Sequence, residues 1–362
     1  MSGPAIGIVG LGTMGRLHAR NVSELGADVV AGADVDEGTR AEFAAEFDAD
    51  TYESHEDLLD VDAVIVTTPN RFHEEIAVDA LEAGCCVLLE KPLAHTLESA
   101  ERIAEAARRS SGFCMVGFHN RFSPAAATAK AYADAGRLGE ITHVEADYVR
   151  RRGIPAPGSW FTDEKLAGGG ALIDVGVHAI DLVLYLLDFP EIVEVTGVTR
   201  SQFGDREDYA DPDGFGAGWD ADGNTFDVDD SVSAFLRTES GQTISLEVAW
   251  ATNRSPSKDV VLRGTEAGAT LEVGGSDVEL YETGTVGIDH HVESTVTGTV
   301  DRRNHAAEAE QFLAAVERRE PPSTNTVEEA LVVQRVIDAI YRSSRSGRAV
   351  PIEPAVAPNP AD

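Results

Sequence analysis

Four polar side chains interrupt the otherwise apolar segment 172–187, and their types could transfer a proton. Asp174, His178, Asp181 and Tyr185 are spaced at i, i+4, i+7 and i+11, so an α-helix turning about 100° per residue would place them in one stripe. An imidazole one turn from a carboxylate can hold one ring tautomer and exchange a proton near neutral pH. The same stripe could be the solvated edge of an amphipathic helix, and the spacing alone does not decide between the two.

A glycine-rich turn near the N-terminus has the spacing of a dinucleotide-binding loop. It follows the apolar run 5–9 and precedes a helical pattern. Glycines at these positions permit a tight turn and a close approach of the backbone to a pyrophosphate, and the helix N-terminus favours its negative charge. The loop residues expected to contact the cofactor are Gly10, Gly12, Thr13, Met14 and Gly15.

An acidic residue stands where such a fold binds the adenosine ribose. Asp34 lies 19 residues after Gly15, at the end of the second predicted strand, where a carboxylate can accept hydrogen bonds from the ribose hydroxyls. Asp36 and Glu37 add negative charge, and the next basic residue is Arg40. This pattern favours NAD over NADP as the cofactor.

Two further strand ends are expected at the same edge of the sheet, where dinucleotides bind. One carries Thr68, Pro69, Asn70 and His73; the other carries Glu90 and Lys91. Asn70 and His73 could contact the cofactor or cap the following helix, and for His73 capping or packing is favoured. Lys91 is either a surface charge at a strand end or a group that points at the nicotinamide.

The first 118 residues alternate between strand-like and helix-like stretches, which predicts a doubly wound parallel sheet. The strands are expected at Ala5–Val9, Val29–Ala33, Ala63–Thr67, Val87–Glu90 and Phe113–Gly117, and the helices at Met14–Leu25, Glu37–Glu46, His73–Ala83 and Leu97–Arg109.

From about residue 140 the pattern predicts an antiparallel or mixed sheet with helices on one face. Strands are expected at Ile141–Val149, Ile192–Arg200, Asp230–Thr238, Gln242–Ala251, Asp259–Gly264, Ala269–Val273 and Asp277–Glu282; helices at Leu172–Leu187, His305–Val316 and Val327–Ser343. The acidic, Gly-rich segment 202–229 is predicted to be a surface loop, and the tail 353–362 to be disordered.

Charge excludes some partners. The chain has 63 acidic and 29 basic residues, a formal net charge of −34, and only four of the basic residues are lysines. Such a surface repels phosphate backbones and anionic lipid, so neither nucleic acid nor membrane is expected as a partner. Because so much like charge destabilises a compact state unless it is screened, we expect a halophilic protein whose folding depends on salt.

The three cysteines, Cys85, Cys86 and Cys114, form neither a disulfide framework nor a zinc spacing. No apolar run approaches the ~18 residues of a membrane span, and the N-terminus has no signal-peptide pattern. We therefore expect a cytoplasmic protein. Metal catalysis is not expected, because Asp174 and His178 have no obvious third ligand in the sequence.

Six motifs in order resemble the glucose-fructose oxidoreductase/inositol dehydrogenase/MocA (Gfo/Idh/MocA) family over nearly the full length. They are Gly10-x-Gly12-x-x-Gly15, Thr68-Pro69-Asn70-x-x-His73, Glu90-Lys91-Pro92, Gly117-Phe-His-Asn-Arg121-Phe, Gly168-Gly-Gly-x-x-x-Asp174-x-Gly-x-His178-x-x-Asp181 and Ser343-x-x-x-Gly347-Arg348. The resemblance implies an α/β fold, in which a Rossmann domain (1–122) precedes an α+β domain (123–352) with a large open, mostly antiparallel sheet. That sheet often forms the subunit interface, which implies a homodimer or homotetramer.

The resemblance also implies a nicotinamide cofactor, NAD in preference to NADP, and oxidation of a sugar or polyol hydroxyl. The family's catalytic Lys, Asp and His fall on Lys91, Asp174 and His178. In such a site His178 would accept the hydroxyl proton, Asp174 would orient the imidazole, and Lys91 would donate a hydrogen bond to the developing alkoxide. Asp181 is expected to anchor the helix or the far end of the substrate.

Substrate contacts are harder to assign from the sequence. The residues considered, because they lie beside predicted site elements, are Arg121, Arg152, Trp160, Asn304 and His305. A Trp can stack on the apolar face of a sugar, whereas the Arg150-Arg151-Arg152 run could equally pair with surface acids. Two other functions stay open: a glycosidase or epimerase-like enzyme that oxidises its substrate transiently with tightly bound NAD, and a non-catalytic sugar- or NAD-sensing regulator.

Overall fold

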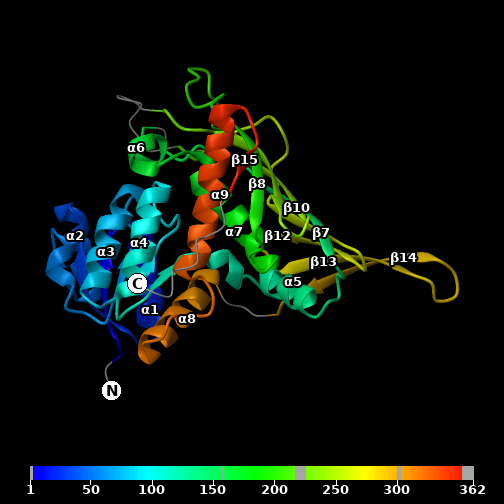
Figure 1. Cartoon of the computed structure of the whole chain (residues 1–362). Coiled ribbons are helices and arrows are strands. Elements are labelled where there is room, and N and C mark those ends of the chain that lie inside the picture. The colour runs from blue at the N-terminus through cyan, green and yellow to red at the C-terminus, as the bar shows by residue number, and fades with distance from the viewer. Residues whose placement is uncertain (1–2, 157, 217–225, 300–302, 353–362) are drawn as a thin grey trace, which may run out of the picture.

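Two β-sheets organise the chain, and the first is entirely parallel (Figure 1). The computed structural model describes residues 3–156, 158–216, 226–299 and 303–352. The first sheet has the order β3-β2-β1-β4-β5-β6. Its strands are β1 (Ala5–Val9), β2 (Asp28–Ala33), β3 (Asp50–Tyr52), β4 (Ala63–Val66), β5 (Cys86–Leu89) and β6 (Cys114–Val116), connected by α1 (Thr13–Glu24), α2 (Glu37–Phe47), α3 (His73–Glu82) and α4 (Leu97–Arg109).

This order is that of a Rossmann fold, and it fixes where a ligand can bind. Strand order reverses between β1 and β4, so the loops after these two strands diverge and leave a crevice at the carboxyl edge. Strands β1, β4 and β5 are short apolar runs covered by helices on both faces, which is why nearly all of their residues are buried.

The second sheet has nine strands in the order β14-β13-β12-β11-β7-β10-β9-β8-β15. The β7–β10 pair is parallel and the other pairs are antiparallel, so the sheet is mixed. Its strands are β7 (Ile141–Val149), β8 (Ile192–Arg200), β9 (Ser231–Thr238), β10 (Thr243–Ala249), β11 (Asp259–Gly264), β12 (Gly268–Glu272), β13 (Asp277–Gly284), β14 (His290–Thr297) and β15 (Val350–Pro351).

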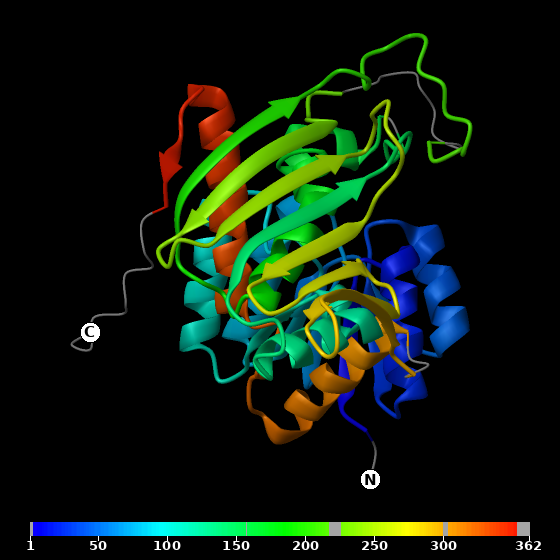
Figure 2. The same ribbon diagram turned by 90° about the vertical axis from the view of Figure 1, so that its right-hand side faces the viewer.

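Helices cover one face of the second sheet. They include α5 (Pro124–Asp134), α7 (Val177–Leu186) and α9 (Val327–Ser346), which lie between the two sheets, while the short α6 (Glu164–Ala167) lies near the first sheet. Figure 2 shows the other face uncovered by any helix of the described chain. That face carries the half-exposed Val198, Phe235 and Tyr281. Assembly of a homo-oligomer through this face stays a prediction.

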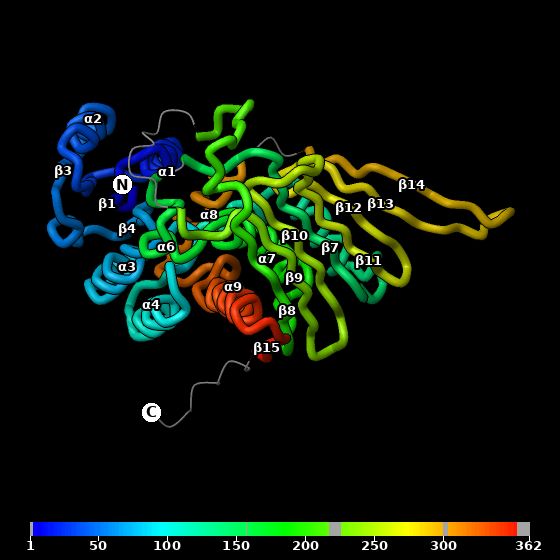
Figure 3. Tube along the Cα trace, turned by 90° about the horizontal axis from the view of Figure 1, so that it is seen from above, coloured from blue at the N-terminus to red at the C-terminus, as the bar shows by residue number. Residues whose placement is uncertain are grey.

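One helix from the C-terminal part of the chain packs on the first sheet. Helix α8 (Asn304–Arg318) contacts α1, and the Phe312 ring meets Phe113 edge-on with centroids 6.1 Å apart. The segment before α9 extends this contact, because Val116 N donates to Asn325 O at 2.8 Å. On the side of the second sheet that lies away from the first sheet, the β13–β14 hairpin projects beyond the rest of the molecule (Figure 3).

Every predicted strand and helix is present, with ends that differ by at most three residues except in segment 172–187. The elements that the sequence pattern missed are α5, α6, β3, β14 and β15. Helix α5 is rich in alanine and has little amphipathic contrast, and the others are short or exposed. Residues 217–225 of the predicted surface loop and the whole tail 353–362 lie outside the described residues.

One segment of the structure bears on the expectation that nothing spans a membrane. One mostly helical segment, Glu164–Leu186, is 23 residues long and apolar enough to cross a membrane by length and composition. In the structure 89% of its most apolar window is buried inside the protein. The core helix of a soluble protein passes the same test, so the segment is weak support for a membrane span.

Candidate active site

The glycine loop leaves room for a pyrophosphate at the start of α1. Gly10 has φ +89°, and a Cβ there would lie 2.9 Å from the backbone of Thr67. A Cβ on Gly12 would meet no atom within 4 Å, so the space above this residue is open. Gly12 is also the N-cap of α1, and no side chain caps the helix there. The first-turn N–H groups of α1 are therefore available to an anionic group, which fits the pyrophosphate of a dinucleotide.

Asp34 lies beside this loop, at the end of β2. Its Oδ2 accepts a hydrogen bond from Leu11 N at 2.8 Å, and its Oδ1 accepts one from Asp36 N at 3.0 Å. Arg40, six residues further along the chain in α2, reaches back and donates from Nη1 to the Asp34 carbonyl at 2.7 Å. The Asp34 carboxylate is therefore held at the place expected for a ribose contact. The nearby cation, Arg40, binds the backbone carbonyl of Asp34 and not its carboxylate.

The segment after β4 joins the two domains. Asn70 Nδ2 donates to Ala167 O at 2.8 Å, and the buried His73 ring lies 3.0 Å from both Thr68 O and Pro92 O. Burial lowers the pKa of His73. These contacts give His73 the packing role that the sequence favoured, because both ring nitrogens face backbone carbonyls. A contact of His73 with the cofactor stays a prediction.

A small cleft of about 90 Å³ opens between the domains at the carboxyl edge of the first sheet. Its lining includes seven residues singled out from the sequence, among them Met14, Thr68, Asn70 and Trp160. The Trp160 ring stacks on Phe161 with centroids 3.8 Å apart, so two aromatic rings close one side. The cleft is also lined by Thr67, Glu90, Lys91, Pro92, Phe161, Ala167, Gly169, Ile173 and Asp174.

Glu90 is buried at this cleft and is ionised. Its Oε1 lies 2.8 Å from His18 Nε2, and its Oε2 accepts a hydrogen bond from Lys91 N at 3.1 Å. Burial alone would raise the pKa of Glu90, but the hydrogen bond from His18 and the charges of His18 and Lys91 lower it to about 2. The carboxylate thus fixes the backbone at Lys91.

Lys91 and Asp174 form an ion pair across the domain boundary. Lys91 Nζ donates to both Oδ1 and the carbonyl O of Asp174, each at 3.0 Å. Trp250 Nε1 donates to Asp174 Oδ2 at 2.9 Å. Burial acts to raise the pKa of Asp174, but the charges of Lys91 and Arg150 and these hydrogen bonds bring it below its ordinary value. The carboxylate is therefore ionised, with both oxygens occupied.

This arrangement corrects the expected pairing of Asp174 with His178. The prediction assumed a straight α-helix over 172–187, but Leu172–Gly176 is a π-helical turn and α7 begins only at Val177. A π turn closes hydrogen bonds between residues five apart instead of four, which rotates the following residues relative to an α-helix. Asp174 consequently bonds to Lys91 and Trp250, and not to His178.

His178 is a buried, neutral imidazole. Its exposure is 7%, and its Nδ1 has no hydrogen-bond partner in the described part of the chain. The His119 ring meets it edge-on with centroids 5.0 Å apart, and the Tyr148 ring lies at 6.3 Å. Burial lowers the pKa of His178 well below its ordinary value, and nearby Lys91, His119, His305 and Arg150 lower it further. Such a ring can accept a proton at neutral pH.

Of the residues predicted to bind substrate, His305 lies near His178, whereas Arg152 does not point toward the site. His305 stacks on His119 at 3.8 Å, which places it one ring away from His178. Asn304 is the first residue of α8. Arg152 points elsewhere, since it donates to Thr252 O and Asn253 Oδ1 and lies over the Phe203 ring. Its neighbour Arg150 is the arginine of this run whose charge acts on Asp174 and His178.

Arg121 is also misassigned as a substrate contact. Its side chain is 1% exposed and binds both carboxylate oxygens of Asp181, with a closest distance of 2.6 Å. It also donates to Glu329 Oε2 at 2.8 Å and to Thr324 Oγ1. Asp181 therefore anchors α7, which is one of the two roles expected for it. Of the four polar residues in segment 172–187, Asp174 and His178 lie at the site, whereas Asp181 stabilises the packing of α7.

Sequence reasoning missed His119, Tyr148 and Trp250, and it chose Arg152 from an arginine run in which Arg150 is the residue that acts on the site. The alternation of β7 and β10 could have found Tyr148, Arg150 and Trp250, because Val144, Ala146, Ile244, Leu246 and Val248 are buried toward the helices. Continuing the same parity puts all three on that inner face. His119 belongs to the quoted Gly117–Arg121 motif, but nothing in its spacing points to His178.

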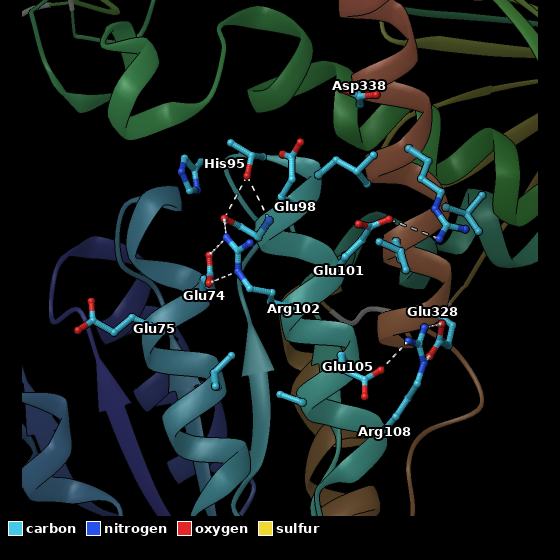
Figure 4. Close-up of a pocket in the computed structure, with 18 of the residues that line it drawn as sticks. Glu74, Glu75, His95, Glu98, Glu101, Arg102, Glu105, Arg108, Glu328 and Asp338 are labelled. Carbon is cyan, nitrogen blue, oxygen red and sulfur yellow. Dashed lines mark hydrogen bonds and ion pairs between the residues drawn. The ribbon is translucent and has the colours of Figure 1, made fainter. Parts of the chain in front are cut away.

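A large hollow lies away from this chemistry, between α3, α4 and α9 (Figure 4). Its charged side chains pair with each other: Arg102 with Glu74, Arg108 with Glu328 and Arg335 with Glu101. The last two pairs join α4 to α9, so the groove is an ion-paired seam between the domains. Among the described residues, no group of three or more His, Cys, Asp or Glu is placed to hold a metal ion.

Comparison with known proteins agrees with this geometry. Residues 5–118 match the model of the oxidoreductase family with an NAD-binding Rossmann fold, and residues 126–270 match the GFO/IDH/MocA C-terminal domain. D-glucoside 3-dehydrogenase of Escherichia coli (strain K12) is 32% identical over 291 residues, which cover 80% of this chain and 79% of that protein. The scyllo-inositol 2-dehydrogenase (NAD(+)) of Bacillus subtilis (strain 168) is 35% identical over 200 residues, 53% of this chain and 56% of that protein.

Solved structures show the same fold. A levoglucosan dehydrogenase in complex with NADH and levoglucosan superposes with a TM-score of 0.84 at 24% identity, covering 97% of this chain and 99% of that one. The motifs, both family models and the first relative thus agree over both domains. The chain belongs to the Gfo/Idh/MocA family of oxidoreductases, and its first domain is the family's NAD-binding Rossmann domain.

Proposed function

We propose that this oxidoreductase removes a hydride from a carbon that bears a hydroxyl group in a sugar or polyol, with His178 as the proton acceptor. The observation that carries the proposal is a buried, neutral imidazole whose pKa is lowered by the charge of nearby Lys91, which pairs with Asp174. Lys91 and Asp174 both line the cleft where the two domains meet. The related D-glucoside 3-dehydrogenase and scyllo-inositol 2-dehydrogenase support a polyhydroxylated substrate.

Bound NAD supplies the hydride acceptor. Oxidation to a carbonyl also requires the hydroxyl to lose its proton, and His178 accepts that proton because its lowered pKa keeps the ring unprotonated. Lys91 Nζ donates to the oxygen on which negative charge develops. Asp174 and Trp250 act on Lys91, since they hold the ammonium group in place through the carboxylate.

A substrate screen tests the activity. Purified protein with NAD in concentrated KCl is assayed for NADH formation on a panel of sugars and inositols. Net NADH formation is expected with at least one of them. Tightly retained NAD without net NADH would instead indicate transient oxidation in a glycosidase or epimerase-like reaction, and no reaction with the panel would contradict a dehydrogenase of simple sugars or inositols.

His178→Ala tests the base on the substrate identified. We expect turnover to fall by ~10²-fold or more, while NAD affinity, measured by fluorescence titration, is unchanged. In the native enzyme the lowered pKa of His178 keeps this base unprotonated at lower pH than a free imidazole. In the pH profile of kcat/KM, the midpoint of the acid limb should therefore lie below about pH 6.5. This limb should disappear in the variant. Unchanged turnover would remove His178 from the mechanism.

A further inference from the structure

The inner face of the second sheet ends beside His178 in a row of four side chains. Buried residues at even positions of β7, β10 and β11 face the helices. Continuing that parity past the strand ends brings Tyr148, Arg150, Trp250 and Lys258 to the same face. Two of them meet the catalytic groups directly: Trp250 bonds to Asp174, and the Tyr148 ring lies 6.3 Å from the His178 ring.

Two cations converge on Tyr148. Lys258 Nζ lies 5.4 Å from its ring centroid, and Arg150 Cζ lies at 5.8 Å. Arg150 is also packed 4.6 Å from the Phe215 ring, and it donates to Gly153 O at 3.2 Å. Both side chains are half-buried and held against aromatic rings. Cation–π contacts orient these charges without neutralising them.

Neither cation is in contact with a carboxylate in the described part of the chain, although the charge of Arg150 also helps to lower the pKa of Asp174. No carboxylate in the described residues forms an ion pair with Arg150 or Lys258, although the chain carries 63 acids against 29 bases. The acids nearest in sequence, Asp147 and Asp259, occupy odd positions that face the opposite side of the sheet; Asp147 pairs there with Arg254. By contrast, the third cation of the site, Lys91, is already neutralised by Asp174.

We propose that Arg150 and Lys258 bind an anionic group of the substrate, so that the preferred substrate is an acidic sugar or polyol carrying a carboxylate or a phosphate. Two like charges held near one ring repel each other, and an anion bound close to both reduces that repulsion. Partial burial strengthens charge-assisted hydrogen bonds to such an anion. The proposal rests on the proposed dehydrogenase function, because it assigns the far end of the same substrate.

Matched probes test the charge requirement and distinguish the two anions. Glucose, glucuronate and glucose 6-phosphate are titrated into the NAD-loaded protein by calorimetry at one fixed KCl concentration, and NADH formation is followed separately. We expect at least one acidic probe to bind about 10-fold or more tightly than glucose, since one charge-assisted contact is worth about that factor. Glucuronate leading indicates a carboxylate, and glucose 6-phosphate leading indicates a phosphate.

Three variants localise the effect. Lys258→Met should reduce affinity for the acidic probe about 10-fold and leave glucose and NAD affinities unchanged. Arg150→Met should also reduce affinity for the acidic probe about 10-fold, and by a larger factor than it changes affinity for glucose. Arg254→Met removes an arginine from the outer face and should change none of these affinities. Glucose binding as tightly as both acidic probes, or an equal loss for acidic and neutral probes in the variants, would overturn the proposal. Binding of an acid without NADH formation with any probe would instead count against the dehydrogenase function alone.

Discussion

Replacing Trp250 with Phe tests whether the carboxylate that holds Lys91 needs both of its partners. The indole Nε1 donates to Asp174 Oδ2 at 2.9 Å, and the Trp250 side chain is fully buried. Phe retains most of the ring but removes the donor, which leaves one oxygen of a buried, ionised carboxylate unpaired. A hydrogen bond to a charged group contributes about 1.5–3 kcal/mol. If the whole of this free energy is lost from the stabilisation of the transition state, kcat/KM falls about 10- to 150-fold.

The assay is steady-state NADH formation on the substrate found by screening, with NAD affinity and the urea unfolding curve measured in parallel. Trp250→Gln is the matched variant, because it restores an N–H donor while losing the ring. If the donor matters, Gln should be more active than Phe, even though Gln removes more buried apolar surface and destabilises the fold more. Equal activity of Phe and the native enzyme, or a Gln variant no better than Phe, would refute the role assigned to the indole.

Two further predictions concern the cofactor and the scaffold. Asp34→Ser should lower the preference for NAD over NADP about 10-fold, since one charge-assisted hydrogen bond to the ribose contributes ~1.5 kcal/mol; the ratio of kcat/KM values for the two cofactors measures it, and an unchanged ratio would mean that another group, such as Arg40, reads the ribose. Arg121→Met should destabilise the protein by about 3–5 kcal/mol, because it leaves the Asp181 carboxylate buried without its partner; urea unfolding measures it, and a loss below ~1 kcal/mol would show that the pair is not essential to the domain contact.

Much of the fold could be predicted from the sequence because the signals are local. The strands of the first sheet are continuous apolar runs, and those of the second alternate buried and exposed residues, so both show in the chain itself. The packing of α8 against α1 could not be predicted, since no local pattern tells a helix which sheet it covers. The same holds for the parallel β7–β10 pair, whose partners are a hundred residues apart.

The candidate site was predicted less completely, for the same reason. Lys91, Asp174 and His178 were identified through motifs, but their contacts depend on the π-helical turn and on side chains from distant strands. Arg121 shows the converse error: its motif position suggested a site residue, whereas two acids from α7 and α9 hold it in the core. Residue type and spacing identify candidates, and tertiary contacts decide which of them face the substrate.

The pairing of Asp174 with Lys91 changes how the carboxylate can act on the proton acceptor. In the expected arrangement Asp174 would stabilise a protonated His178 directly, and its removal would lower the pKa of the imidazole. In the observed arrangement the carboxylate offsets the charge of Lys91, one of the cations that lower the pKa of His178. Its effect on His178 is therefore indirect and works through the position and charge of Lys91. Any change that loosens the Lys91–Asp174 pair should impair the stabilisation of the alkoxide before it impairs the proton acceptor.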